Sequence, residues 1–310
     1  MAARFLSAAE KLARFAMNRR GLASRFVDVA GVRLHVYDGR GGGTLPPVVL
    51  LHGLGSGGAA FAGLVRHLAP HVSRIVIPEL PGHGFSTRGE RAITPELLLE
   101  AIGGAIDIVL DEPAIVYGSS LGGGIAIKYA LERPERVRAL VLVSPAGAPL
   151  PDHEWEALVK TFHVTGPREA RAFLERLYHR PPWFLALLAR EFPHVLARPA
   201  VREILESATQ AHAPSPEDLG RLAMPLLFVW GRSEKLLPAS ALRYFRAHLP
   251  AHAVIEEPAG FGHTPQLEVP ARLAERVVAF LKSVDFRRVA CASGDLDPAT
   301  LSPARSPLRS

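Results

Sequence analysis

Residues 115–130 read IVYGSSLGGGIAIKYA, and this stretch places two adjacent serines where an apolar run becomes glycine-rich. The segment 114–117 suits a short buried strand, whereas residues 121–132 suit a helix that Pro134 stops. A turn this tight between a strand and a helix forces its central residue into a strained backbone conformation. Glycines on either side remove the side chains that would clash. The pattern therefore predicts a strand-to-helix turn that presents a serine hydroxyl.

Of the two serines, Ser120 stands at the centre of a G-x-S-x-G pentapeptide, residues 118–122. The frame centred on Ser119 fails, because Tyr117 and Leu121 occupy the places where it requires glycine. A glycine-rich turn that binds phosphate through backbone amides is the alternative interpretation of the pentapeptide taken alone. The strand before it and the helix after it favour a nucleophile, so we expect Ser120 to attack the substrate.

The rest of the chain alternates short apolar strands with helices after an opening hairpin around Gly31. This alternation predicts an α/β fold with a mostly parallel sheet and helices on both faces. A helix is expected at residues 95–110, with Thr94 as its N-cap and Pro95 in its first position. Each glycine-rich turn follows a strand, which is where such sheets bind their ligands.

Changes in composition divide the chain into four parts. We expect an amphipathic N-terminal helix in residues 1–22 and an α/β core formed by residues 23–149 and 223–284. Residues 150–222 are rich in helix formers, aromatics and prolines, and they predict a helical insertion without strands. Residues 285–310 have low hydrophobicity and many prolines and serines, which predicts a disordered tail.

The net charge of +6 is concentrated at the N-terminus, where residues 1–22 hold five basic side chains and one glutamate. An apolar stripe on a basic helix suits the surface of an anionic membrane, so peripheral membrane contact is one hypothesis for this segment. The alternative hypotheses are that this helix packs on the body of the protein or that it forms a solvated arm. The stripe consists of Phe5, Ala9, Leu12, Phe15 and Ala16.

Several classes of protein are disfavoured by composition. No basic patch with interleaved aromatics is present, so we do not expect a nucleic-acid binder. Cys291 is the single cysteine, which excludes an internal disulfide and fits a reducing compartment. No apolar run reaches the length of a membrane span, and Glu10 and Lys11 interrupt the N-terminus too early for a signal peptide. We therefore expect a cytoplasmic protein. No metal-ligand cluster is apparent, and no cofactor is predicted.

A serine nucleophile needs a base, a group that orients the base, and an oxyanion hole. The segment GFGHTPQLEVP offers His263, and GRSEKLLP offers Glu234, each just after a predicted strand. The glycine-rich turn HGLGSG offers the amide of Leu54, which together with the amide of Leu121 would hold the oxyanion. His52 opens that turn and is expected to be structural.

These motifs together resemble the α/β-hydrolase fold enzymes of the esterase and lipase type, over about residues 26–281. The resemblance is carried by LHGLGSGG, LPGHGFS, GSSLGGG, WGRSEKLLP and GHTPQLEVP. It implies an eight-stranded, mostly parallel sheet with a helical cap at residues 150–222 over the active site. The residue roles that the resemblance implies are nucleophile Ser120, general base His263, acid Glu234, and oxyanion amides of Leu54 and Leu121.

The sequence departs from the family pattern at two acidic positions. The usual acid of the triad is aspartate, whereas Glu234 is one methylene longer, and Lys235 beside it could draw it outward. Asp152 is the rival for the acid role. Position 79 holds glutamate where aspartate is common, and His83 in the neighbouring loop is expected to be structural.

The residues predict a serine hydrolase that cleaves carboxylic esters with an apolar part, through an acyl-enzyme on Ser120. A C–C bond hydrolase or an acyltransferase on the same triad is the enzymatic alternative. A non-catalytic binding protein on this fold is the alternative of another class, although it would not require Ser120 and His263. The natural substrate and the oligomeric state stay open. Six aromatics are interpreted first as core of the insertion and second as an acyl-binding wall: Phe162, Phe173, Tyr178, Trp183, Phe184 and Phe192.

Overall fold

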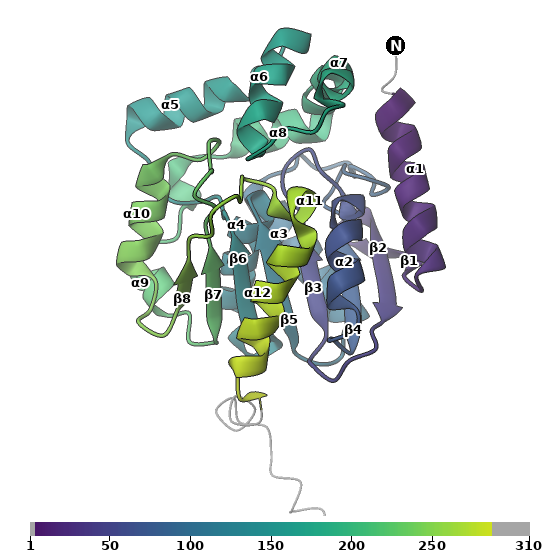
Figure 1. The fold of residues 1–310 in the computed structure, drawn as a ribbon, viewed down its shortest axis with the longest axis vertical. Coiled ribbons are helices and arrows are strands. Elements are labelled where there is room, and N and C mark those ends of the chain that lie inside the picture. The colour runs from purple at the N-terminus through teal and green to yellow at the C-terminus, as the bar shows by residue number, and fades with distance from the viewer. Residues whose placement is uncertain (1–3, 287–310) are drawn as a thin grey trace, which may run out of the picture.

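A computed structural model describes residues 4–286 and centres on one eight-stranded sheet (Figure 1). The strands follow the order β1-β2-β4-β3-β5-β6-β7-β8 across the sheet. Strand β2 runs antiparallel to β1 and β4, and all other neighbours are parallel, which confirms the predicted fold class. The strands are β1 (Ala23–Val29), β2 (Val32–Arg40), β3 (Val48–Leu51), β4 (Arg74–Pro78), β5 (Ala114–Ser119), β6 (Val137–Val143), β7 (Leu226–Val229) and β8 (Val254–Glu256).

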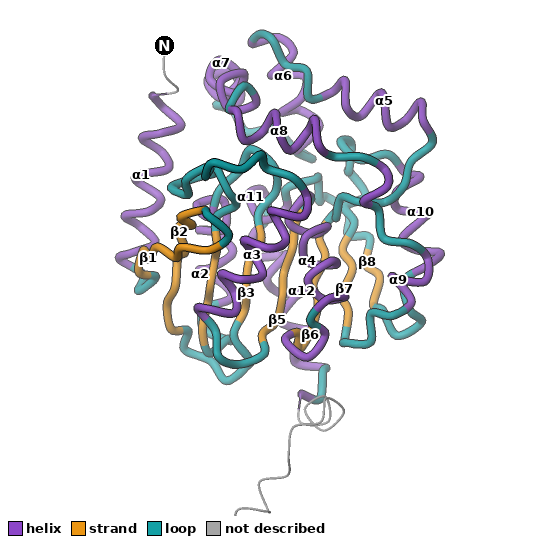
Figure 2. Tube along the Cα trace, turned by 180° about the vertical axis from the view of Figure 1, so that it is seen from behind, coloured by secondary structure: helices purple, strands orange, loops and turns teal. Residues whose placement is uncertain are grey.

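Helices cover both faces of this sheet, as Figures 1 and 2 show from opposite sides. Helices α2 (Ala62–Leu68) and α12 (Pro270–Ser283) lie on one face, and α3 (Pro95–Val109) and α4 (Leu121–Glu132) on the other. Successive side chains of a strand point to opposite faces of the sheet, so alternate strand residues pack into two separate hydrophobic cores. The shorter elements of the body are η1 (Gly58–Phe61), η2 (Pro134–Arg136), α10 (Ala239–His248) and α11 (Pro265–Glu268).

Two local features of the fold agree with the sequence patterns. Ala30 and Gly31 both have positive φ, at 54° and 75°, in the two-residue turn that joins β1 to β2. This geometry closes antiparallel strands without splaying them, and it confirms the hairpin. Helix α3 begins at Pro95 with Thr94 as N-cap, whose hydroxyl accepts a 3.3 Å hydrogen bond from the amide of Leu97. The predicted helix is therefore confirmed, and it ends at Val109.

Between β6 and β7 the chain forms a group of helices over the carboxyl-terminal edge of the parallel strands (Figures 1 and 2). Because ligands of such sheets bind at that edge, these helices lie over the place where the motif residues converge. The helices are α5 (Asp152–Thr161), α6 (Pro167–Leu177), α7 (Leu185–Leu196), α8 (Pro199–Ser207), η3 (Gln210–His212) and α9 (Pro216–Gly220). Of the segment 285–310, all residues beyond 286 lie outside the described part of the chain.

Helix α1 (Arg4–Arg19) lies beside β1, α2 and α7 along one side of the body (Figure 1). Its contact face carries Met17, which is fully buried, and Arg14, whose guanidinium lies 4.2 Å from the centre of the Phe85 ring. Leu12 and Phe15 of the apolar stripe are instead 68% and 58% exposed. These two side chains of the stripe therefore do not pack on the body. None of the described helices is long and apolar enough to cross a membrane.

Candidate active site

Ser120 occupies the sharp turn between β5 and α4, with φ 54° and ψ −124°. A residue with a side chain rarely adopts positive φ, so the turn holds Ser120 in a strained conformation. A Cβ atom at Gly118 would overlap the carbonyl of Gly122, and a Cβ at Gly122 would overlap the carbonyl of Leu51. Glycine is therefore required at position 118 for α4 to lie so close to β5, and at position 122 for α4 to lie so close to β3. The pentapeptide forms the predicted strand-to-helix turn.

The glycine-rich turn after β3 lies directly against this serine. A Cβ atom placed on Gly53 would be 3.1 Å from the Cβ of Ser120 and 3.6 Å from its hydroxyl oxygen. Leu54, the next residue, lines the same cavity as Ser120. Leu121 is the first residue of α4, so its amide has no acceptor within the helix. The backbone at Gly53 thus lies next to the side chain of Ser120, and the start of α4 follows Ser120 directly in the chain.

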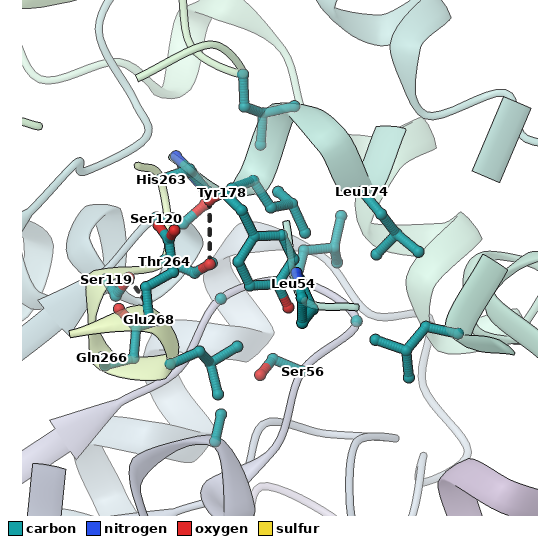
Figure 3. Close-up of a pocket in the computed structure, with 18 of the residues that line it drawn as sticks. Leu54, Ser56, Ser119, Ser120, Leu174, Tyr178, His263, Thr264, Gln266 and Glu268 are labelled. Atoms are coloured by element: carbon teal, nitrogen blue, oxygen red, sulfur yellow. Dashed lines mark hydrogen bonds between the residues drawn. The ribbon is translucent and has the colours of Figure 1, made fainter. Parts of the chain in front are cut away.

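His263 and Glu234 form a buried pair in the loops that follow β8 and β7. The Nδ1 of His263 donates a 2.7 Å hydrogen bond to Oε2 of Glu234, and both side chains are almost completely buried. The other carboxylate oxygen accepts the amides of Leu236 at 2.7 Å and Leu237 at 3.0 Å. Because Nδ1 carries the proton, Nε2 is the ring nitrogen left to receive another. His263 lines the cavity that also contains Ser120 (Figure 3).

The charge of Glu234 follows from these contacts. Burial by itself raises the pKa of this carboxyl group, because it disfavours the charged form. The attraction of His263, its hydrogen bond and the amide of Leu237 outweigh burial and bring the pKa of Glu234 below its usual 4.5. The pair therefore consists of a charged carboxylate and an imidazole that it orients near neutral pH.

The rival acid lies elsewhere. Asp152 is exposed at the first turn of α5, and its carboxylate accepts a long 3.5 Å hydrogen bond from Gln210. Lys235 is exposed as well, while Glu234 turns inward to His263. Of the two acids that the sequence leaves open, the structure joins Glu234 to the histidine.

Two further histidines near the site, His52 and His83, hold loops in place. His52 donates from Nδ1 to the carbonyl of Gly53 at 2.9 Å, and its Nε2 accepts the amide of Leu80 at 3.1 Å. His83 likewise donates to a carbonyl of its own loop, and its Nε2 accepts the amide of Gly55 at 3.1 Å. Burial lowers the pKa of His52, and it lowers that of His83 to about 3. Both rings are thus neutral and satisfied by backbone groups, in agreement with a structural role.

Glu79, the second departure from the family pattern, connects three segments. Its carboxylate accepts the amides of Gly58 at 2.8 Å and Phe85 at 2.7 Å, and Nδ1 of His35 at 3.0 Å. Burial raises the pKa of Glu79, but the hydrogen bonds from His35 and Phe85 outweigh it and bring that pKa below 4.5. The buried carboxylate therefore fixes the loops at one end of the cavity.

The cavity around Ser120 has a volume of about 1060 Å³ and extends beneath the helices between β6 and β7 (Figure 3). Five of the six aromatics line the cavity, as the interpretation as a wall predicts, and Phe173 and Tyr178 are also buried among these helices. Trp183 is 94% exposed and does not line the cavity, so for this residue both interpretations are wrong. A wall of this kind excludes water and favours apolar ligands. The apolar lining from this region consists of Phe162, Phe173, Leu174, Leu177, Tyr178, Pro182, Phe184, Leu188 and Phe192.

One glutamate that the sequence patterns did not single out joins these helices to the His263 loop. The carboxylate of Glu268 accepts the amides of Gly262 at 3.2 Å, His179 at 3.0 Å and Arg180 at 2.9 Å. Glu268 lies within the GHTPQLEVP motif, which is the one signal in the sequence that could have drawn attention to it. Glu268 therefore joins Gly262, the residue before His263, to residues 179–180, which follow α6.

Ser119 also faces the site in a way that the sequence patterns did not foresee. Nε2 of Gln266 donates to its hydroxyl at 3.4 Å, and both side chains line the cavity (Figure 3). Oε1 of Gln266 is buried and has no hydrogen-bond partner within residues 4–286. Over the same residues, no group of three or more His, Cys, Asp and Glu side chains could hold a metal ion.

The fold and the nucleophile turn, followed by the glutamate and histidine loops, define a hydrolase. The chain belongs to the α/β-hydrolase family, and the family model of the alpha/beta hydrolase fold matches residues 46–181. It is 33% identical over 260 residues to a pimeloyl-[acyl-carrier protein] methyl ester esterase of Xanthomonas oryzae pv. oryzae, covering 77% of this chain and 96% of that protein.

Two further comparisons agree with this assignment. A 2-hydroxymuconate semialdehyde hydrolase of a Pseudomonas species is 27% identical, over 84% of this chain and 94% of that protein. The crystal structure of a bacterial membrane phospholipase A superposes with a TM-score of 0.75 and covers 92% of each chain at 24% identity. At that identity the structural likeness shows the fold.

Proposed function

We propose that this protein hydrolyses carboxylic esters through an acyl-enzyme formed on Ser120. The observation that carries the proposal is the buried hydrogen bond between Glu234 and His263, in the cavity that Ser120 lines. Ser120, Glu234 and His263 follow one another along the chain in the serine, acid, histidine order of this fold, which supports nucleophilic acyl transfer. The 33% identical relative, a methyl ester esterase, supports the same bond type.

The first half of the reaction follows from the placement of these groups. Oγ of Ser120 attacks the ester carbonyl carbon while Nε2 of His263 takes the hydroxyl proton. The charged Glu234 stabilises the imidazolium that forms, and it holds the ring in the required tautomer. The carbonyl oxygen becomes an oxyanion, to which the amides of Leu54 and Leu121 donate.

The second half returns the enzyme to its starting state. The imidazolium of His263 gives its proton to the leaving alkoxide, the C–O bond breaks and the alcohol departs. A water molecule then attacks the acyl carbonyl of Ser120 while His263 accepts its proton. Collapse of that intermediate releases the carboxylic acid, and the proton returns to the serine oxygen. No step calls on a cofactor.

The segment 150–222 acts in this proposal as a cap that shapes the acyl-binding wall. The apolar side chains of Phe173, Leu174 and Phe192 lining the cavity support a preference for medium apolar acyl groups over acetyl. Each methylene that the wall removes from water contributes about 0.8 kcal/mol, which is roughly fourfold in kcat/KM while the chain still fits. A series of p-nitrophenyl esters measures this dependence, and a flat profile would remove the apolar wall from the proposal.

A C–C bond hydrolase is the second candidate, since the 27% identical 2-hydroxymuconate semialdehyde hydrolase aligns over 84% of this chain. An acyltransferase would use the same acyl-enzyme with an alcohol in place of water. Parallel assays separate the three activities: an ester panel, a ring-cleavage product that carries a vinylogous diketone, and an ester with competing alcohols. Ester turnover above the other two supports the proposal.

A fluorophosphonate probe tests the nucleophile itself, because it reacts with activated serines. We expect labelling of the folded protein to map to Ser120 and to be lost in Ser120→Ala. The Ser119→Ala variant is the matched control, since it removes the neighbouring hydroxyl in the same cavity. Folded protein that stays unlabelled while it binds ester ligands would favour the non-catalytic binding protein.

Membrane contact through residues 1–22 is a separate proposal. It is supported by Leu12 and Phe15, whose side chains point away from the body, on a helix with basic side chains. Deleting the whole segment would uncover the core at Met17, so point substitutions are the better test. The double variant Leu12→Ser with Phe15→Ser should sediment more weakly than the parent with anionic liposomes and keep ester turnover. Equal sedimentation of variant and parent would remove the idea.

A further inference from the structure

Four exposed apolar side chains either line the Ser120 cavity or stand next in the chain to residues that line it, and we name them the rim. Trp183, Phe184 and Leu187 come from the α6–α7 connection and the start of α7, and Leu267 comes from α11. Trp183 is 94% exposed, and its ring meets Phe184 edge to face at 5.5 Å. Phe184 and Leu267 also line the cavity, so the rim lies where the cavity opens to solvent.

Trp183 is the most exposed of the large apolar side chains in the described residues, whereas Trp230 is buried and Trp155 is partly buried. Contiguous apolar surface in water marks a site of interaction. Tryptophan suits the boundary between water and lipid in particular, because its ring is apolar and its indole N–H still finds water or a polar headgroup. The exposure of Trp183 is therefore explained most directly by a partner that offers both environments.

The charges at the same mouth are cationic. Arg180 and Arg272 are exposed and line the cavity, and the guanidinium of Arg272 is held by the carbonyl of Ala259 at 3.0 Å. Glu268, an acidic residue of the same cavity lining, is turned to three backbone amides. Two arginines beside an apolar rim complement anionic headgroups above acyl chains.

We propose that the rim docks on the surface of an anionic lipid bilayer, so that ester substrates enter the Ser120 cavity from the lipid phase. The inference extends the proposed ester hydrolysis by naming where the substrate is met. It concerns a different surface from the stripe of α1. Docking here places the cavity mouth against the acyl chains, so an apolar ester transfers without crossing water.

A second copy of this chain on the rim would cover the same apolar area. It would also close the mouth through which substrate enters the cavity, whereas a bilayer supplies substrate through it. The bilayer therefore accounts for both the patch and its position, and self-association becomes an outcome of the test.

Vesicle sedimentation tests the proposal with a pair of matched variants. Trp183→Ser combined with Leu187→Ser removes two rim side chains that do not line the cavity. Ile108→Ser is the control, because Ile108 is 61% exposed on α3, away from the mouth. The probe is vesicles of phosphatidylcholine mixed with phosphatidylglycerol, with phosphatidylcholine alone for comparison. We expect the rim variant to lose roughly tenfold or more of its partition coefficient, and the control to keep it.

Tryptophan fluorescence reports the contact directly. Trp230 is buried and Trp155 is partly buried, so a vesicle-induced blue shift of the parent emission comes from Trp183. The shift should vanish in Trp183→Phe, which keeps an apolar side chain at the rim. Raised salt should weaken the sedimentation, since it screens the arginines from the headgroups.

Turnover of a water-soluble ester by the same proteins separates this proposal from the proposed function. Equal turnover by parent and rim variant, with vesicle binding only by the parent, supports docking at the rim. Docking is overturned if the parent fails to sediment with vesicles, or if the rim variant sediments as well as the parent. It is also overturned if the parent is a dimer that does not bind vesicles and the rim variant is a monomer, because the rim would then be a dimer interface. A parent that sediments through the rim but turns over no ester would refute the hydrolase proposal and leave docking intact.

Discussion

Oε2 of Glu234 lies 2.7 Å from Nδ1 of His263, across 29 positions of sequence. The two residues meet because β7 and β8 are parallel neighbours, so the loops that follow them leave the same edge of the sheet. The extra methylene of glutamate is accommodated because its second oxygen is held by the amides of Leu236 and Leu237. These bonds fix a side chain that would otherwise have one more rotatable bond than aspartate.

Replacing Glu234 by glutamine should lower kcat by roughly 10⁴-fold, because the amide removes the charge and can favour the wrong tautomer of His263. Asp152→Asn is the matched substitution, and it should change kcat little. Both are compared as folded proteins of equal melting temperature. The reverse ranking would move the acid role to Asp152.

Ser120→Ala should lower ester turnover by roughly 10⁴- to 10⁶-fold, as loss of a triad member does. Ser119→Ala removes a hydroxyl that accepts a hydrogen bond from Gln266, and it should leave most of the turnover. Steady-state rates on one ester measure both. An active Ser120→Ala protein would show that the pentapeptide frame is wrong.

Gly122→Ala should destabilise the fold by roughly 1–3 kcal/mol or more, because the added Cβ overlaps the carbonyl of Leu51. The helical Gly220 is the control, since a Cβ there meets nothing within 4 Å. Its replacement by alanine should leave stability unchanged or raise it by up to about 1 kcal/mol. Urea unfolding measures the two variants, and equal midpoints would contradict the close approach of α4 to β3.

Glu268→Gln should loosen the connection between the α6 segment and the loop that carries His263. The amide keeps one acceptor oxygen, but its NH₂ then faces backbone N–H groups, which should cost about 1–3 kcal/mol. We expect a lower melting temperature together with a lower kcat. Glu206→Gln on α8 serves as the exposed control. If both variants match the parent, the carboxylate does not tie the two segments.

Glu79 should make stability depend on pH in acid. Its pKa in the folded state lies below 4.5, so the unfolded chain binds more protons as pH falls. Its contribution is thus fully present above about pH 4.5 and is lost as pH falls through the lowered pKa. Urea unfolding of the parent and Glu79→Gln over a pH series should show a stability gap that narrows in acid. A gap that stays constant well below pH 4.5 would contradict this assignment.

The sequence by itself determined the features whose physics is local. The glycines around Ser120, the turn at Gly31 and the cap at Thr94 each follow from backbone sterics or a hydrogen bond within a few residues. Alternation of strands and helices, with glycine-rich turns at strand ends, determined the α/β class and brought Ser120, Glu234 and His263 forward as candidates. None of these inferences depends on knowing how far apart in space two segments lie that are distant in the sequence.

Only the tertiary structure decided what depends on such distances. It joined Glu234 rather than Asp152 to the histidine, because loop paths at the sheet edge are set by packing. It left Leu12 and Phe15 of α1 in solvent, although helical periodicity alone cannot tell a buried face from an exposed one. It also placed aromatics of residues 150–222 in a cavity wall and left Trp183 in solvent, since identical apolar residues serve a core, a pocket or a docking surface according to what lies opposite them.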